Sequence, residues 1–172
     1  MRTRRSCLGP LAIAALLTGA SVALLADPAG SESDASRCVS INGVAVVQSG
    51  TATCISTLST GAEPNVARAT GDDSVAEAAV GSGNTATANG PGSIAVAGVG
   101  NNNTATANGK DSRSGAGPGD NNSSTANGRG SLAETGNGTG NTVTANGHCM
   151  IVVSGSYVTR TCHPSHGTEP PS

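Results

Sequence analysis

A short segment repeats along the middle of the chain with a constant period of nineteen positions, and this periodicity constrains the fold more than any other feature. The heptapeptide Asn-Thr-Ala-Thr-Ala-Asn-Gly stands at residues 84–90 and 103–109, and variants of it follow at 122–128 and 141–147. A more diverged copy occupies residues 65–71. A fixed period of this length is typical of proteins in which similar units stack on one another.

The composition leaves two outcomes open for such a chain. Its 172 residues include 25 Gly and one Tyr but no Phe or Trp, so the large apolar side chains that supply most burial energy are scarce. A disordered, low-complexity linker is one outcome. Drifting low-complexity sequence has no reason to keep a constant phase, so we favour a fold with a small-residue interior. We predict an all-β parallel β-solenoid (β-roll) of about five 19-residue coils, with an alanine-rich interior and end caps that contain cysteine.

Two segments of each coil alternate with a period of two, as strands do when successive side chains point to opposite faces. Charged residues identify the outer face, because Arg68 falls in the column of Thr87 and Glu77 falls in the column of Val96. The positions between them are therefore predicted to face inward. They are Ala76, Ala78, Ala86, Ala88, Ala95, Ala97, Ser114, Ala116, Ala133, Thr135 and their equivalents.

Asparagine also recurs in one column, at 65, 84, 103, 122 and 141. We interpret this column as a ladder in which stacked amides form hydrogen bonds along the coils. The Asn-Gly pairs of the repeat could instead form hairpin turns. A hairpin meander, however, does not explain why whole coils repeat in register.

The regions outside the repeat suggest an exported protein. Arg2, Arg4 and Arg5 precede an apolar run, which is the layout of an export signal, and the paired arginines resemble a twin-arginine signal. We predict export by the Sec or the twin-arginine route to a secreted or cell-surface location; a membrane anchor is the alternative if the signal stays uncleaved. The predicted segments are a signal peptide (1–26), a linker (27–37), an N-terminal cap (38–64), the solenoid (65–147), a C-terminal hairpin cap (148–163) and a flexible tail (164–172).

Four cysteines flank the solenoid, two on each side. Because they lie in pairs at opposite ends of the repeats and the compartment is oxidising, we predict the disulfides Cys38–Cys54 and Cys149–Cys162. The alternative is a metal site formed with His148, His163 and His166, but the spacing matches no standard zinc pattern. Beside the cysteines, residues 39–47 are predicted to form a strand, a turn and a strand, and residues 150–161 a hairpin about Ser154-Gly155.

The repeats resemble the head repeats of trimeric autotransporter adhesins, most closely at residues 73–78 (Asp-Ser-Val-Ala-Glu-Ala) and 92–98 (Gly-Ser-Ile-Ala-Val-Ala-Gly). That resemblance implies a left-handed parallel β-roll in a surface or secreted interaction protein. The chain as a whole resembles secreted actinobacterial proteins of unknown function. We therefore expect a structural or adhesin-like interaction protein with an unknown surface or matrix ligand. The apolar outward residues Val75, Ile94, Val96 and Leu132 also suggest a homo-oligomer or another partner chain.

A second hypothesis comes from the outward hydroxyl rows, which resemble the Thr-x-Thr rows of ice-binding β-solenoids. The residues are Thr85, Thr87, Thr104, Thr106, Ser123, Thr125, Thr142 and Thr144. The simpler explanation is that threonine is a soluble residue that suits strands.

Other functional classes find little support in the sequence. From residue 27 onward the chain has six basic and eleven acidic residues, so no basic surface for nucleic acid is expected. Calcium-binding rolls need aspartate at a fixed column, and we predict that Asp72, Asp73, Asp111 and Asp120 share none. Glu77 and Glu134 share a column three coils apart, about 14 Å, which is too far for a glycosidase pair. We therefore expect no enzyme, no metal and no cofactor.

Overall fold

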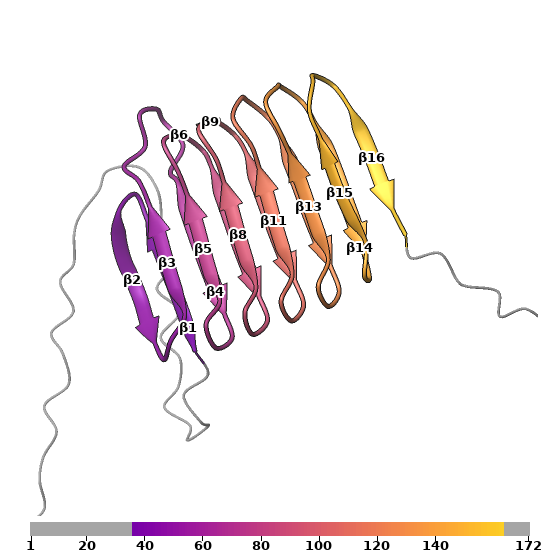
Figure 1. The fold of residues 1–172 in the computed structure, drawn as a ribbon. Helices are drawn as coiled ribbons and strands as arrows, with labels where there is room; N and C mark the ends of the chain where they lie inside the picture. The colour runs from indigo at the N-terminus through magenta and orange to yellow at the C-terminus, as the bar shows by residue number, and fades with distance from the viewer. Residues whose placement is uncertain (1–35, 164–172) are drawn as a thin grey trace, which may run out of the picture. The chain divides into compact units, whose positions relative to one another are not determined.

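The computed structural model describes residues 36–163. The predicted signal peptide, most of the predicted linker and the predicted tail lie outside the described residues. Between residues 36 and 163 the chain forms strands and turns without a helix. Successive coils follow one another along one axis, with two main sheets facing each other (Figure 1).

The larger sheet, here called sheet A, has eight strands. In chain order they are β1 (Arg37–Ile41), β2 (Val44–Ser49), β4 (Val66–Thr70), β7 (Thr85–Asn89), β10 (Thr104–Asn108), β12 (Ser123–Asn127), β14 (Thr142–Asn146) and β16 (Thr159–Cys162). Their order across the sheet is β16-β14-β12-β10-β7-β4-β1-β2. From β4 to β16 all neighbours are parallel.

Sheet B has six parallel strands in the order β15-β13-β11-β8-β5-β3. They are β3 (Thr53–Ser56), β5 (Val75–Ala78), β8 (Ile94–Ala97), β11 (Arg113–Ala116), β13 (Leu132–Thr135) and β15 (Met150–Val153). A third, two-stranded sheet pairs β6 (Gly81–Ser82) with β9 (Gly100–Asn101) on one turn of the coils.

The strands pair in the register that the repeat predicts. Thr85 pairs with Thr104, Thr104 with Ser123, and Ser123 with Thr142, each one period further along the chain. This confirms the parallel β-solenoid for residues 65–147, in preference to a meander or a disordered segment. About six turns are present where the sequence predicted about five.

The additional turn lies at the C-terminal end, where the predicted hairpin is wrong. Met150 pairs with Leu132 and Thr159 pairs with Thr142, so β15 extends sheet B and β16 extends sheet A. The segment between them crosses from one sheet to the other, as in every preceding coil. Met150 follows its partner Leu132 by 18 positions and Thr159 follows Thr142 by 17, instead of the usual 19. The shortened coil therefore does not follow the repeat.

The N-terminal end has a different, antiparallel structure. β1 and β2 form the predicted strand-turn-strand unit around Asn42 and Gly43, whose φ angles of 49° and 80° suit a tight hairpin turn. β1 also runs antiparallel to β4. The Oδ1 atom of Asn42 accepts hydrogen bonds from the backbone N–H groups of Ser59 and Asn65. In the first coil Asn42 therefore takes the place of a preceding asparagine of the ladder, which in later coils accepts the equivalent backbone N–H.

The interior consists of alanine columns, as predicted. Ala86, Ala88, Ala95 and Ala97 and their equivalents in other coils are fully buried between sheets A and B. Where alanine is missing, a hydroxyl takes its place and finds a partner. Ser114 Oγ lies 3.0 Å from Ser124 Oγ, and Thr135 Oγ1 accepts from the backbone N–H of Gly117. No buried side-chain polar atom within residues 36–163 lacks a hydrogen bond, so these substitutions avoid the cost of an unpaired polar group.

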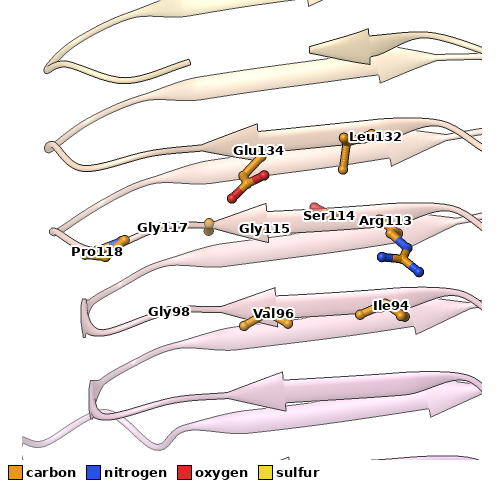
Figure 2. A pocket seen from close by; sticks show the side chains of 11 residues that line it. Ile94, Val96, Gly98, Arg113, Ser114, Gly115, Gly117, Pro118, Leu132 and Glu134 are labelled. Atoms are coloured by element: carbon orange, nitrogen blue, oxygen red, sulfur yellow. The ribbon is translucent and has the colours of Figure 1, made fainter. Parts of the chain in front are cut away.

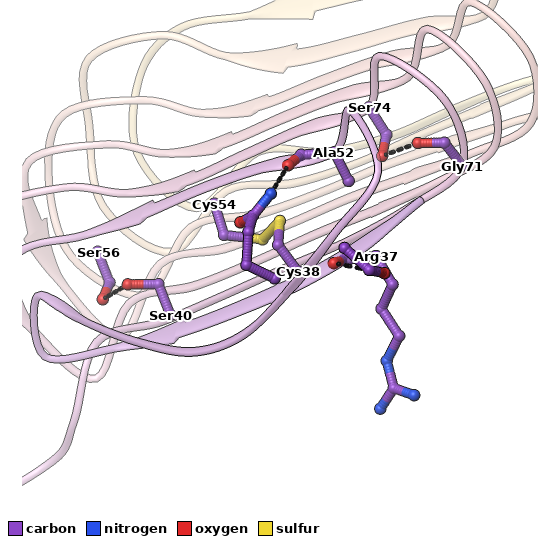
Figure 3. Close-up of a disulfide and its surroundings, with 10 residues drawn as sticks. Arg37, Cys38, Ser40, Ala52, Cys54, Ser56, Gly71 and Ser74 are labelled. Carbon is purple, nitrogen blue, oxygen red and sulfur yellow. Dashed lines mark hydrogen bonds between the residues drawn. A yellow bond between two sulfur atoms is a disulfide. The ribbon is translucent and has the colours of Figure 1, made fainter. Parts of the chain in front are cut away.

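Both predicted disulfides are present, and both lie in interior columns. Cys38 occupies the column of Ala69, and Cys54 occupies that of Ala76 (Figure 3). At the other end Cys162 occupies the column of Ala145 and bonds to Cys149. The Cα–Cα distances are 5.7 and 6.0 Å. Because the alanine interior is thin, cysteines on the two facing sheets are close enough to form a disulfide. In each end coil the disulfide fills interior space that alanine or serine side chains fill in the other coils.

Buried asparagines connect successive coils through their backbone. The Oδ1 atoms of Asn65, Asn84, Asn103 and Asn122 each accept a hydrogen bond from the backbone N–H of the asparagine in the next coil, at 2.9–3.1 Å. The Oδ1 atom of Asn141 accepts from the backbone N–H of Val158 in the last coil, at 3.0 Å. Each Nδ2 donates to the carbonyl of a turn glycine, at 2.6–3.0 Å. The predicted ladder is therefore present, with bonds that run mainly from side chain to backbone.

Candidate binding surfaces

The outer side of sheet A carries hydroxyl groups in straight rows, and we call it the hydroxyl face. All eight predicted outward hydroxyls lie there, half-buried or exposed. One row follows the first residue of each strand and the second row follows the third residue, because the strands pair without any offset. Neighbouring rungs of a parallel sheet are about 4.8 Å apart, and residues i and i+2 of a strand about 6.6 Å.

Two further threonines belong to the hydroxyl face and were missed by the sequence analysis. Thr159 pairs with Thr142, and Thr161 pairs with Thr144, so each row has five hydroxyl groups instead of four. Both side chains are exposed. The irregular length of the last coil hid them. At the opposite end, Val66 and Arg68 occupy the same columns and end the two rows.

A third row, of amides, runs beside the hydroxyls. Asn89, Asn108, Asn127 and Asn146 stand one per coil. The Nδ2 atoms of the first three donate to the Oδ1 of the next asparagine, at 3.0, 3.0 and 3.1 Å. These bonds hold the amide planes in one orientation, so the face presents a fixed pattern of uncharged donors and acceptors.

The outer side of sheet B is chemically different, and we call it the apolar face. It combines apolar residues with three charges, one threonine and one glycine. Its outward residues are Thr53, Ile55, Val75, Glu77, Ile94, Val96, Arg113, Gly115, Leu132, Glu134, Met150 and Val152. Ile55, Met150 and Val152 are 51, 71 and 61 % exposed.

A shallow hollow of about 520 Å³ lies in the middle of the apolar face (Figure 2). It forms because Gly115 has no side chain between Val96 of the preceding coil and Glu134 of the following one. Arg113 and Leu132 flank it on the neighbouring column. Within residues 36–163, no ion pair to Arg113 or Glu134 is present, and both side chains are exposed.

Ionisable side chains do not converge anywhere in the described part of the chain. Glu77 and Glu134 lie three coils apart in one column, as the sequence indicated. Between residues 36 and 163, no group of three or more His, Cys, Asp and Glu side chains is placed to hold a metal ion. One prediction is corrected: Asp73 and Asp111 do share a column, two coils apart. Both have positive φ, at 56° each, and the same column has glycine at 92 and 130. The left-handed backbone of this turn therefore explains why aspartate and glycine alternate in the column.

Comparison with known proteins gives no relative. No family model, no curated protein and no solved structure matches the chain. The part of the adhesin resemblance that the structure confirms is the parallel β-solenoid of stacked coils. Among residues 36–163 there is also no helix long and apolar enough to cross a membrane.

Proposed function

We propose that this protein is an exported interaction protein that binds its ligand through the hydroxyl face. The observation that carries the proposal is the in-register alignment of two five-membered hydroxyl rows. The amide row widens this pattern along four of the coils. A surface built from one short unit repeated many times suits a ligand that is itself periodic.

The chemistry of the face indicates the class of ligand. Apart from Arg68 at one end, the outward side chains of its rows from β4 to β16 are uncharged. Hydroxyl and amide groups recognise other neutral donors and acceptors, and short side chains lose little conformational entropy on binding. A neutral, polyhydroxylated polymer of a cell surface or extracellular matrix fits these properties. The proposal gives the expected adhesin-like interaction a specific surface on which it can be tested.

Export is supported by the cysteines. Cys38, Cys54, Cys149 and Cys162 all lie in disulfides, which persist in oxidising compartments and are rare in the cytosol. The ligand would then be met outside the cell.

Ordered water is the second candidate ligand. The extension of the rows by Thr159 and Thr161 favours it, because a longer flat array of hydroxyls matches more of an ice lattice. An ice surface and a glycan chain both present periodic hydroxyl groups, so the same side chains would serve either one.

The experiment compares a double Thr→Tyr variant with a matched control. Thr106→Tyr combined with Thr125→Tyr puts two bulky side chains in the centre of the hydroxyl face, while Thr60→Tyr makes the same kind of change at an exposed position in the turn between β3 and β4. We expect the central variant to weaken retention on insoluble chitin or cellulose, or inhibition of ice recrystallisation, by on the order of tenfold, about 1.4 kcal/mol. The Thr60 variant should behave as the native protein does.

Circular dichroism and the thermal midpoint show whether each variant is folded. The proposal is contradicted if the native protein neither binds these polymers nor inhibits recrystallisation. It is equally contradicted if the central variant retains full activity. Activity on ice alone would select the second candidate.

A further inference from the structure

The apolar face has a projecting side chain and a hollow at the same coil, in its two neighbouring outward columns. Arg113 and Gly115 belong to the same strand, β11, and both point outward, two residues apart. Arg113 projects from one column, and the hollow lies where Gly115 leaves the other column empty. Glu134 stands beside the hollow, one coil further along, and its side chain extends toward it (Figure 2).

These positions are self-complementary. Consider a second copy placed face to face, with a twofold axis that runs along the stack between the two outward columns. This rotation exchanges the columns and keeps each coil opposite its own equivalent. Arg113 of one copy then enters the hollow over Gly115 of the other. Measured along the stack, the position of Arg113 is then one strand spacing, about 4.8 Å, from the position of the second copy's Glu134. The same contact occurs twice, as twofold symmetry requires.

The remaining residues of the face are compatible with this arrangement. Ile94 lies opposite Val96 of the second copy, and Met150 lies opposite Val152, so apolar side chains meet on both sides of the charged pair. Met150 and Val152 are more than half exposed in the single chain. Glu77 lies opposite Val75, two coils from the nearest arginine, and is the one charge of the face without an opposite charge in this arrangement.

We propose that the apolar face joins two copies of this chain into a parallel dimer. The charge pair between Arg113 and Glu134 of the second copy fixes the register of this dimer. Six coils of four-residue strands give a face of about 24 by 13 Å. This is smaller than the roughly 800 Å² per partner of a standard stable interface. The dimer should therefore be weak and should dissociate on dilution.

Dimerisation has a consequence for the hydroxyl face. Sheets A and B lie on opposite sides of the interior, so joining two B sheets leaves both hydroxyl faces outward, on opposite sides of the dimer. Such a dimer contacts two polymer chains or two surfaces at once, and its apparent affinity for a dense ligand rises through multivalency. The dimer itself does not depend on the proposed function and is tested without any ligand.

Charge reversal tests the contact on the full oxidised chain. Sedimentation velocity over a series of micromolar concentrations should show dimer for the native protein and monomer for Arg113→Glu alone or Glu134→Arg alone. Mixing these two variants should restore the dimer, because each of its two contacts then again joins one acidic and one basic side chain. Glu77→Gln should strengthen native association.

Two controls separate the contact from general effects. Arg129→Glu makes the same charge change in the turn before β13, away from the apolar face, and should leave association unchanged. Gly115→Val fills the hollow and should reduce association. Its Cβ meets only the side chain of Glu134, at 3.3 Å from Cγ, and this exposed side chain can move. A native protein that stays monomeric overturns the proposal. A dimer that survives either single charge reversal, or a mixture that fails to associate, also overturns it.

Discussion

Replacing Gly100 with alanine is expected to destabilise the solenoid by about 2–6 kcal/mol. A Cβ atom at this position would lie 2.0 Å from the carbonyl oxygen of Gly119 in the next coil. The backbone there has φ of +130°, which side chains other than hydrogen rarely permit. Strained backbone costs about 1–3 kcal/mol and forced overpacking about 1–3 kcal/mol more. To relieve the clash, the coils would have to separate at β9.

The matched control is Gly115→Ala, in the middle of β11. Gly115 has ordinary strand geometry, and the nearest atom to its Cβ is an exposed glutamate side chain. Urea denaturation should show a clear loss of stability for Gly100→Ala and a change within about 0.5 kcal/mol for Gly115→Ala. Equal stabilities of the two variants would mean that the coils do not approach each other as closely as the structure shows.

The same contact recurs in every coil. A Cβ at Gly81, Gly119 or Gly138 would come within 1.6–1.9 Å of the carbonyl oxygen of a glycine in the next coil. This explains why the column has glycine at each repeat, while glycine at 115 belongs to a column that otherwise has side chains.

Replacing Asn103 with alanine is the second change with a large expected effect, a loss of about 2–6 kcal/mol. Asn103 is completely buried. Its Oδ1 accepts from the backbone N–H of Asn122 at 3.1 Å, and its Nδ2 donates to the carbonyl of Gly119 at 2.7 Å. Alanine leaves both backbone groups without these partners inside the stack. Each unpaired buried group costs about 1–3 kcal/mol.

Asn108→Ala provides the control, because it removes an asparagine of the same coil from the amide row of the hydroxyl face. Asn108 is only partly buried, and its partners are the side chains of Asn89 and Asn127, which water can replace. We expect this variant to lose less than about 1 kcal/mol in the same denaturation experiment. A loss for Asn103→Ala no greater than that for Asn108→Ala would contradict the role of the buried ladder.

Much of this fold could be predicted because the period holds each column in a constant environment. One charged residue in a column, such as Arg68 in the column of Thr87, is enough to assign the whole column to the outside. Alternation then assigns its neighbours to the interior. The disulfides followed from the segregation of the cysteines, and the structure adds that each pair lies in columns that alanine or serine fills elsewhere.

The last coil could not be predicted in this way, because it departs from the repeat in both length and composition. Val158 stands where the ladder would have asparagine, and Cys149 stands in the column of Ser131. The short segments on either side of Ser154-Gly155, each with strand-forming residues, then favour a hairpin by local criteria. Pairing with the preceding coil prevails because it continues two sheets that already present unpaired edges.

The two surfaces differ in how far the sequence predicts them. The hydroxyl rows are a regular pattern and were predicted as far as the period extends. The hollow at Gly115 is an exception within a column, and its relation to Glu134 depends on which residues of different coils become neighbours. The interior pair Ser114 and Ser124 illustrates the same limit, since two serines far apart along the coil bond only because the sheets face each other.

Distance measurement across the stack tests the central claim most directly. Arg68→Cys and Thr161→Cys place spin labels on one outward column of sheet A, at β4 and β16, while the native disulfides stay oxidised. Five strand spacings separate these positions, so pulsed dipolar spectroscopy should show a narrow distribution centred at about 24 Å. A disordered chain of that length gives a broad distribution centred at roughly 50 Å, and this result would contradict the in-register solenoid on which both proposed surfaces depend.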